Sequence, residues 1–290
     1  NQMLQKRFYT KLLLITLIFA GFSSCIINDN IKDTSVLIDP GNDPNFKILL
    51  NTDDGYEVFN RKVIVFNIPI YAFASVDDSK LLHFANILAQ YLDNNEDGLV
   101  DNLIVHDAIK ADNGFLFLWQ TIEEKDSFTF PTGHKGKGIK EDAINLIWHS
   151  NGHTGDFDAS IKTLWNFITE VGFETTYPAI FSSQANSEIS IAMDLARGGN
   201  FQNPPASYPA GAWFTNTDAT CNYACQITTY NYWVMTSMLS AHENRLTNIQ
   251  DEWTLNTRDK VQNNDVKAWA IFTNVNYNLP TLLPDGTYKH

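Results

Sequence analysis

The chain has 290 residues, of which 44% are hydrophobic and 13% aromatic, so it can bury a sizeable core in one large domain or two smaller ones. Its formal net charge of -13 argues against nucleic acid and anionic membrane surfaces as partners, because both repel an acidic protein. The same charge is compatible with binding of divalent cations.

The first 24 residues have the features of an export signal. A basic start precedes an apolar run at residues 12–22, which is too short to span a bilayer as a mature helix. Ser23 and Ser24 then stand directly before Cys25. This arrangement resembles the lipobox of bacterial lipoproteins, and the resemblance implies cleavage before Cys25 and lipidation of its sulfur. An ordinary secretory signal that ends near a cysteine is the alternative.

The predicted organisation is a signal peptide at residues 1–24, a tether at 25–45 and a single domain at 46–290. The tether is rich in Asn, Asp and Ile and contains Pro and Gly. A lipid on Cys25 would hold the protein at the outer membrane or the cell surface.

Hydrophobic patterns within the domain predict strands first and helices later, which indicates the α+β class. An apolar face on the first predicted helix leaves His83 and Asn86 outside it, so we expect those two side chains to be solvated. The predicted strands cover residues 46–50, 62–74, 115–119 and 143–148, and the predicted helices cover 77–92, 160–171, 187–196, 228–246 and 265–272.

A loop after the first predicted helix has the spacing D-x-N-x-D-G-x-x-D. Alternate side-chain oxygens in such a loop can converge on Ca²⁺, and Gly98 allows the sharp turn around the ion. The predicted ligands are the side chains of Asp93, Asn95, Asp97 and Asp101 and the backbone carbonyl of Leu99. The loop resembles those of EF-hands, dockerins and thrombospondin type 3 repeats. It departs from the EF-hand at position 12, where Ile104 replaces a bidentate Glu, so we expect a structural ion and not a regulatory sensor. An acidic turn without metal is the alternative.

Two cysteines remain after the proposed cleavage, Cys221 and Cys225. In an oxidising exported compartment, two such residues predict one disulfide that restrains a local turn. A zinc half-site is the alternative, although no second pair of cysteines completes it.

One other cluster has metal-ligand side chains at short spacing: His149, His153 and Asp156, with Asp158 close behind. Asn151 and Gly152 disfavour a helix here, but a loop could bring both imidazoles to one zinc ion. A polar turn between two elements is the alternative.

Several segments resemble a group of uncharacterised secreted proteins: residues 82–101, 192–199, 221–226 and 282–286. In that group the helix that begins here at Asp158 carries E-E-x-x-H, and a Glu follows the Cys-Gln segment. This layout is similar to a zincin, in which such residues hold a catalytic zinc. The chain departs from the pattern at each corresponding position, because it has Lys162, Thr163, Asn166 and Thr229 there.

The resemblance therefore implies an inactive relative of a metallopeptidase-like family. Our first hypothesis is a non-catalytic, calcium-binding cell-envelope lipoprotein that binds a glycan or a protein, with Trp213, Phe214 and Tyr223 as candidate sugar contacts. The alternative is a zinc-dependent hydrolase that uses His149, His153 and Asp156.

Overall fold

The structure is a computed structural model that describes residues 35–36 and 45–290. The predicted signal peptide, the lipidation site at Cys25 and most of the predicted tether lie outside the described residues.

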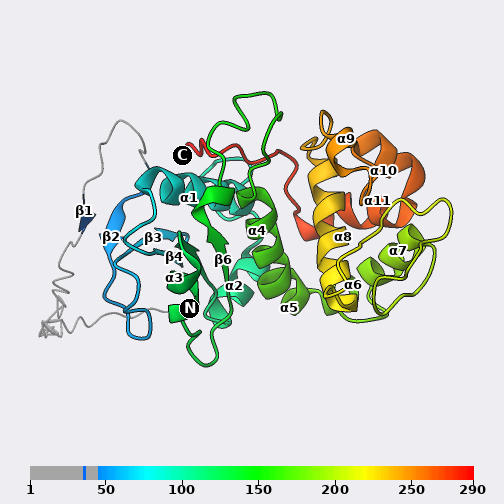
Figure 1. Ribbon diagram of the computed structural model, residues 1–290. Coiled ribbons are helices and arrows are strands. Elements are labelled where there is room, and N and C mark those ends of the chain that lie inside the picture. The colour runs from blue at the N-terminus through cyan, green and yellow to red at the C-terminus, as the bar shows by residue number, and fades with distance from the viewer. Residues whose placement is uncertain (1–34, 37–44) are drawn as a thin grey trace, which may run out of the picture. The chain divides into compact units, whose positions relative to one another are not determined.

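A six-stranded mixed sheet organises the N-terminal half of the described chain (Figure 1). The strands lie in chain order; the first four are antiparallel, and the last two continue the sheet in parallel. They are β1 (Ser35–Val36), β2 (Ile48–Leu50), β3 (Arg61–Val65), β4 (Ile68–Ala72), β5 (Phe115–Trp119) and β6 (Gly136–Lys140). Since parallel strands need a long crossover, the β4–β5 connection has room for two helices and the loop between them.

Helices dominate the second half, which confirms the predicted α+β class. The later helices pack around α8 (Figure 1). The helices are α1 (Asp78–Leu92), α2 (Leu103–Ala111), α3 (Ile122–Ser127), α4 (Ser160–Phe167), the π-helical η2 (Ile168–Phe173), α5 (Glu174–Thr176), α6 (Pro178–Phe181), α7 (Glu188–Arg197), α8 (Tyr223–Met238), α9 (Leu246–Ile249), α10 (Arg258–Asn264) and α11 (Val266–Phe272), with 3-10 turns η1 (Glu141–Ala143) and η3 (Val275–Tyr277).

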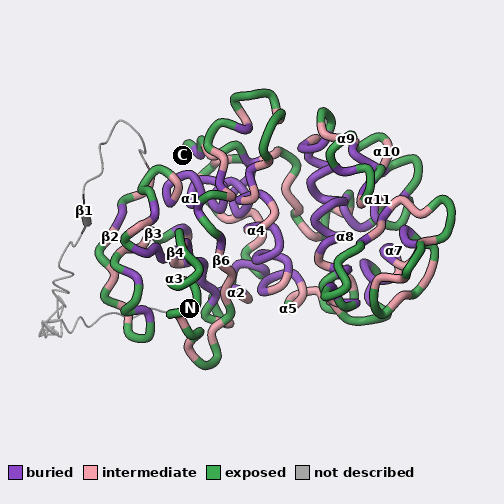
Figure 2. The backbone as a smooth tube through the Cα atoms, in the orientation of Figure 1, coloured by how far each residue is buried: buried purple, intermediate pink, exposed green. Residues whose placement is uncertain are grey.

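Helix α1 packs on β3, β4 and α4, and every residue from Leu81 to Leu92 is buried (Figure 2). The expectation that His83 and Asn86 face solvent is therefore wrong. Residues from far along the chain cover part of α1: the N–H groups of Asp285 and Gly286 donate to Gln90, and Gly286 lies beside the His83 ring. A pattern within one helix cannot reveal a cover that comes from so far along the sequence.

Several predicted boundaries are confirmed or corrected by local chemistry. Helix α7 begins where the Ser187 hydroxyl accepts a hydrogen bond from the Ser190 N–H and ends at left-handed Gly198, as predicted. Helix α8 begins earlier than expected, because the Asn222 side chain caps the Cys225 N–H. The predicted strand at residues 143–148 is wrong, since the Asn145 side chain accepts from the Ile147 N–H and favours turns there.

Candidate functional site

The loop after α1 wraps around its own side-chain oxygens. The Asp93 carboxylate accepts hydrogen bonds from the N–H groups of Asp97 at 3.1 Å and Gly98 at 2.8 Å. Asn95 Oδ1 accepts from the Asp97 N–H at 3.0 Å, and Asp97 Oδ1 accepts from the Leu99 N–H at 2.9 Å. Gly98 has φ +85°, the left-handed turn that the spacing predicted. The chain thus folds into a series of tight turns around Asp93, Asn95 and Asp97.

Negative charge accumulates in this loop. Burial raises the pKa of the Asp101 carboxyl, and the charges of Asp93 and Asp97 raise it further, while a hydrogen bond from the Asn94 N–H lowers it. A cation would relieve the repulsion among these groups. The carboxylates of the loop do not form a convergent group of three ligand atoms in the described part of the chain, so the calcium site stays a prediction.

The C-terminal segment closes the loop from outside. Tyr288 donates its hydroxyl to Asp93 Oδ2 at 2.6 Å. Asn94 Oδ1 accepts from the N–H groups of Thr281 and Leu282, both at 2.8 Å, and Asn94 Nδ2 donates to the Leu282 carbonyl. We call residues 281–288 the C-terminal strap. The strap fixes the first residues of the loop against the end of α1.

A second cluster lies near the middle of α1. His83 Nε2 is 2.6 Å from Asp158 Oδ2, and His149 Nε2 is 3.6 Å from the same oxygen. One ligand atom from each of the three residues lies within 4.8 Å of the other two, and this is the only such group among the described residues. The cluster joins α1, the loop after η1 and the start of α4, and it has the donor types of a transition-metal site.

Electrostatics favour an ionised carboxylate at the centre of this cluster. Burial alone would raise the pKa of Asp158, which is fully buried, but the His149 and His83 imidazoles and Ser160 outweigh burial and hold that pKa well below its usual range. Asp158 Oδ1 also accepts from the Ser160 N–H at 3.0 Å. The carboxylate is therefore negative and fixed in orientation.

The residues predicted to bind zinc are only partly brought together. His149 belongs to the cluster, whereas Asp156 is exposed and the His153 ring packs on Trp148 with 4.5 Å between centroids. Asp158 takes the place expected for Asp156. Nothing in the sequence indicated that His83 belongs to this cluster, because its partners His149 and Asp158 lie 66 and 75 residues further along the chain.

A cleft of about 610 Å³ lies between α4, α8 and the segment around α9. Lys162 and Thr229, two of the positions at which the chain departs from the zincin pattern, both line it. Asn166 is buried and is not among the lining residues. The polar and charged residues that line the cleft are Lys162, Asn216, Thr217, Asp218, Thr229, Arg245, Asn248, Asp251 and Glu252, and Trp233 adds an aromatic ring.

Lys162 and Glu252 influence each other across this cleft. Burial lowers the pKa of the Lys162 ammonium, and the charge of Glu252 opposes that effect. Burial raises the pKa of the Glu252 carboxyl, while Trp233 and Lys162 lower it. The Lys162 ammonium also lies 5.0 Å from the centre of the Tyr232 ring, a cation–π contact. Partly buried charges of both signs in one cleft are typical of functional sites.

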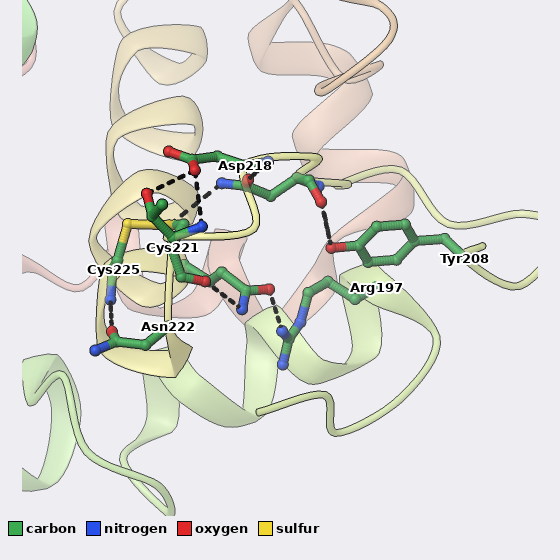
Figure 3. The surroundings of a disulfide bond; sticks show 9 residues. Arg197, Tyr208, Asp218, Cys221, Asn222 and Cys225 are labelled. Atoms are coloured by element: carbon green, nitrogen blue, oxygen red, sulfur yellow. Dashed lines mark hydrogen bonds between the residues drawn. A yellow bond between two sulfur atoms is a disulfide. The ribbon is translucent and has the colours of Figure 1, made fainter. Parts of the chain in front are cut away.

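The predicted disulfide between Cys221 and Cys225 is present at the edge of the cleft (Figure 3). The bridge spans the first turn of α8 and the loop before it, where the Asp218 carboxylate accepts from the Thr220 N–H and hydroxyl. Below it, buried Arg197 donates to Gln226 (Figure 3). The disulfide therefore restrains the loop at the edge of the cleft, next to the buried hydrogen bond between Arg197 and Gln226.

The aromatic residues predicted to contact sugars are largely enclosed. Phe214 is fully buried, Tyr223 is 8% exposed, and the Trp213 indole donates to Asp265 Oδ2 at 2.8 Å. None of the three lines the cleft. They stabilise the helical half of the protein and are not free for a ligand.

Comparison with protein-family models, with curated proteins and with solved structures found no match. Among the described residues, no helix combines the length and the apolar character needed to cross a membrane.

Proposed function

We propose that the protein is a calcium-stabilised, lipid-anchored binding protein of the cell envelope, with its ligand site in the cleft between α4 and α8. The observation that supports this proposal is the lining of the cleft, which includes Lys162 and Thr229, the residues at two positions where the resembled group carries metal ligands. An ammonium group repels a cation, and Thr offers no carboxylate. The one convergent metal-ligand group in the described chain does not line the cleft.

A glycan is the ligand class that best fits the cleft. Its lining offers hydrogen-bond donors on Lys162, Arg245 and Asn248 and acceptors on Asp251 and Glu252. Sugar hydroxyls both donate and accept, so they can use such a mixed lining. A wholly apolar ligand would leave these groups unpaired, which costs about 1–3 kcal/mol for each buried group.

Cleft variants test the binding proposal. The full chain is applied to an array of glycans and cell-envelope extracts, and the affinity for any ligand found is compared with that of Lys162→Met and Glu252→Gln. We expect a loss of roughly tenfold to 100-fold, because hydrogen bonds to charged groups contribute about 1.5–3 kcal/mol. Lys267→Met is the control, since Lys267 is exposed on α11. Unchanged binding in both cleft variants would place the ligand elsewhere.

The anchor and the calcium site are tested separately. If Cys25 carries lipid, Cys25→Ser moves the protein from the membrane fraction to the soluble fraction. Calcium is proposed as a structural ion, because the 93–101 loop has the spacing of a calcium loop and folds into tight turns around Asp93, Asn95 and Asp97.

A zinc-dependent hydrolase is the second candidate, because His149 lies close to two further residues that can bind a metal, His83 and Asp158. Burial argues against it: the His149 side chain is 8% exposed and Asp158 is 0% exposed, and neither lines a described cavity. A catalytic zinc needs an open position that substrate can reach. Peptide hydrolysis that disappears in His149→Ala would favour the hydrolase.

A further inference from the structure

The imidazole of His149 is buried without any hydrogen bond. Both Nδ1 and Nε2 are shielded from solvent and have no hydrogen-bond partner among the described residues. Nearly all buried polar groups in proteins are paired, and an unpaired one costs about 1–3 kcal/mol. The unpaired ring faces Asp158, whose Oδ2 is 3.6 Å from Nε2. An additional partner of the imidazole therefore belongs at this place.

The spacing of the cluster fits a small tetrahedral ion. Zinc bonds of about 2.0–2.1 Å to nitrogen and oxygen put neighbouring ligand atoms roughly 3.3 Å apart. The distances from Asp158 Oδ2, 2.6 Å to His83 Nε2 and 3.6 Å to His149 Nε2, lie on either side of that value. The third spacing, between the His83 and His149 nitrogens, is at most 4.8 Å, so it would shorten by no more than about 1.5 Å when an ion binds.

We propose that His83, His149 and Asp158 bind one zinc ion as a structural site, separate from the cleft. Two imidazole nitrogens and one carboxylate oxygen suit zinc among the divalent metals. Asp158 Oδ1 is already held by the Ser160 N–H, the kind of outer hydrogen bond that orients a metal ligand. A ligating nitrogen must be unprotonated, so His83 would offer the ion its Nε2 lone pair in place of its present hydrogen bond to Asp158.

An ion at this place would stabilise the packing of three separate segments of the chain. His83 lies in α1, His149 follows η1, and Asp158 precedes α4, so one ion would tie three segments to the strap, whose Gly286 packs on the His83 ring. Three protein ligands leave a fourth position for water. The burial of His149 and Asp158 excludes a larger substrate from that position.

The test uses two matched pairs of variants. The full chain is loaded with zinc, passed over a desalting column and measured for bound metal, and cobalt is used as a visible probe of tetrahedral ligation. We expect one zinc per chain, and at least tenfold weaker binding in His149→Ala and Asp158→Asn. His153→Ala and Asp156→Asn should bind like the unmodified protein. His149→Ala is the decisive variant, because the His149 side chain makes no hydrogen bond whose loss would unfold the chain.

Two results would overturn the proposal. One is the absence of stoichiometric zinc or cobalt in folded protein, checked by circular dichroism. The other is binding that depends on His153 and Asp156 but survives in His149→Ala. Ligand binding in the cleft is measured separately, so failure of the zinc site leaves the proposed binding function intact, and the reverse also holds.

Discussion

Removal of calcium should lower the melting temperature of the protein measurably. In the ion-free loop, Asp93, Asp97 and Asp101 repel one another. The pKa of Asp101 is raised mainly by burial, and the charges of Asp93 and Asp97 raise it further. An ion that binds only the native state at about 100 times its Kd adds about 2.7 kcal/mol to the free energy of unfolding. For a domain of this size, that corresponds to a shift of about 5–10 °C.

The assay is thermal unfolding followed by circular dichroism in calcium, in chelator and in magnesium. Magnesium should substitute poorly, because it requires near-octahedral geometry and holds its water molecules. Asp97→Asn keeps the acceptor for the Leu99 N–H but removes a charge, so its melting temperature in chelator should equal or exceed that of the unmodified protein. Calcium should raise the melting temperature of Asp97→Asn only slightly. Asp126→Asn, at an exposed site on α3, is the control.

Superimposed melting curves in calcium and chelator would refute this reasoning, because they would make the loop an acidic turn without metal. An equal calcium gain in Asp97→Asn would also refute it, since the ion would then lie elsewhere.

Three further predictions concern stability. Burial, together with Arg245 and His153, lowers the pKa of His242 to about 3, so the unfolded chain binds one more proton between pH 3 and about 6.5. The free energy of unfolding should therefore fall by up to about 1.4 kcal/mol per pH unit in that window as pH decreases. Urea unfolding at several pH values should show a weaker dependence of this free energy on pH for His242→Gln than for the unmodified protein. An equal pH dependence of the two proteins would contradict the assignment. Gly286→Ala should destabilise more than Gly211→Ala in the same assay: both have positive φ, but only at Gly286 would a Cβ meet His83, at 2.2 Å from Nδ1. The Cys221→Ser/Cys225→Ser double variant should lose only about 2 kcal/mol, because the bridge closes a short loop; a loss of 5 kcal/mol would mean that it restrains more than the cleft rim.

Elements with local signals could be predicted from the sequence. Helix α7 is delimited by residues directly at its ends, the Ser187 cap and Gly198. The disulfide could be predicted because Cys221 and Cys225 leave only one pairing to consider. The turn chemistry of the 93–101 loop is local in the same sense, since Asp93 bonds to residues four and five positions later.

Sites that depend on distant segments could not be predicted. His83 looked solvated because its cover, the strap, follows about 200 residues later, and nothing near His83 signals that cover. Glu252 is not part of any sequence motif that could indicate a site. Lys162 and Thr229 line the same cleft only because α4 packs against α8. Asp156 and Asp158 are equivalent by spacing alone, and it is the start of α4 that turns Asp158 inward.

The C-terminal strap connects the two proposed ion sites. It closes the calcium loop through Tyr288 and Asp93, which are 195 residues apart, and it passes over His83 at Gly286. Between these points Gln90 Oε1 accepts from the N–H groups of Asp285 and Gly286, so the strap follows α1 from the loop to the His83 cluster. Contacts between residues so distant in sequence form late, because the entropy of closing the chain must be overcome first. Both proposed sites therefore lie against the strap, and an ion bound at either one would stabilise the same α1–strap contact.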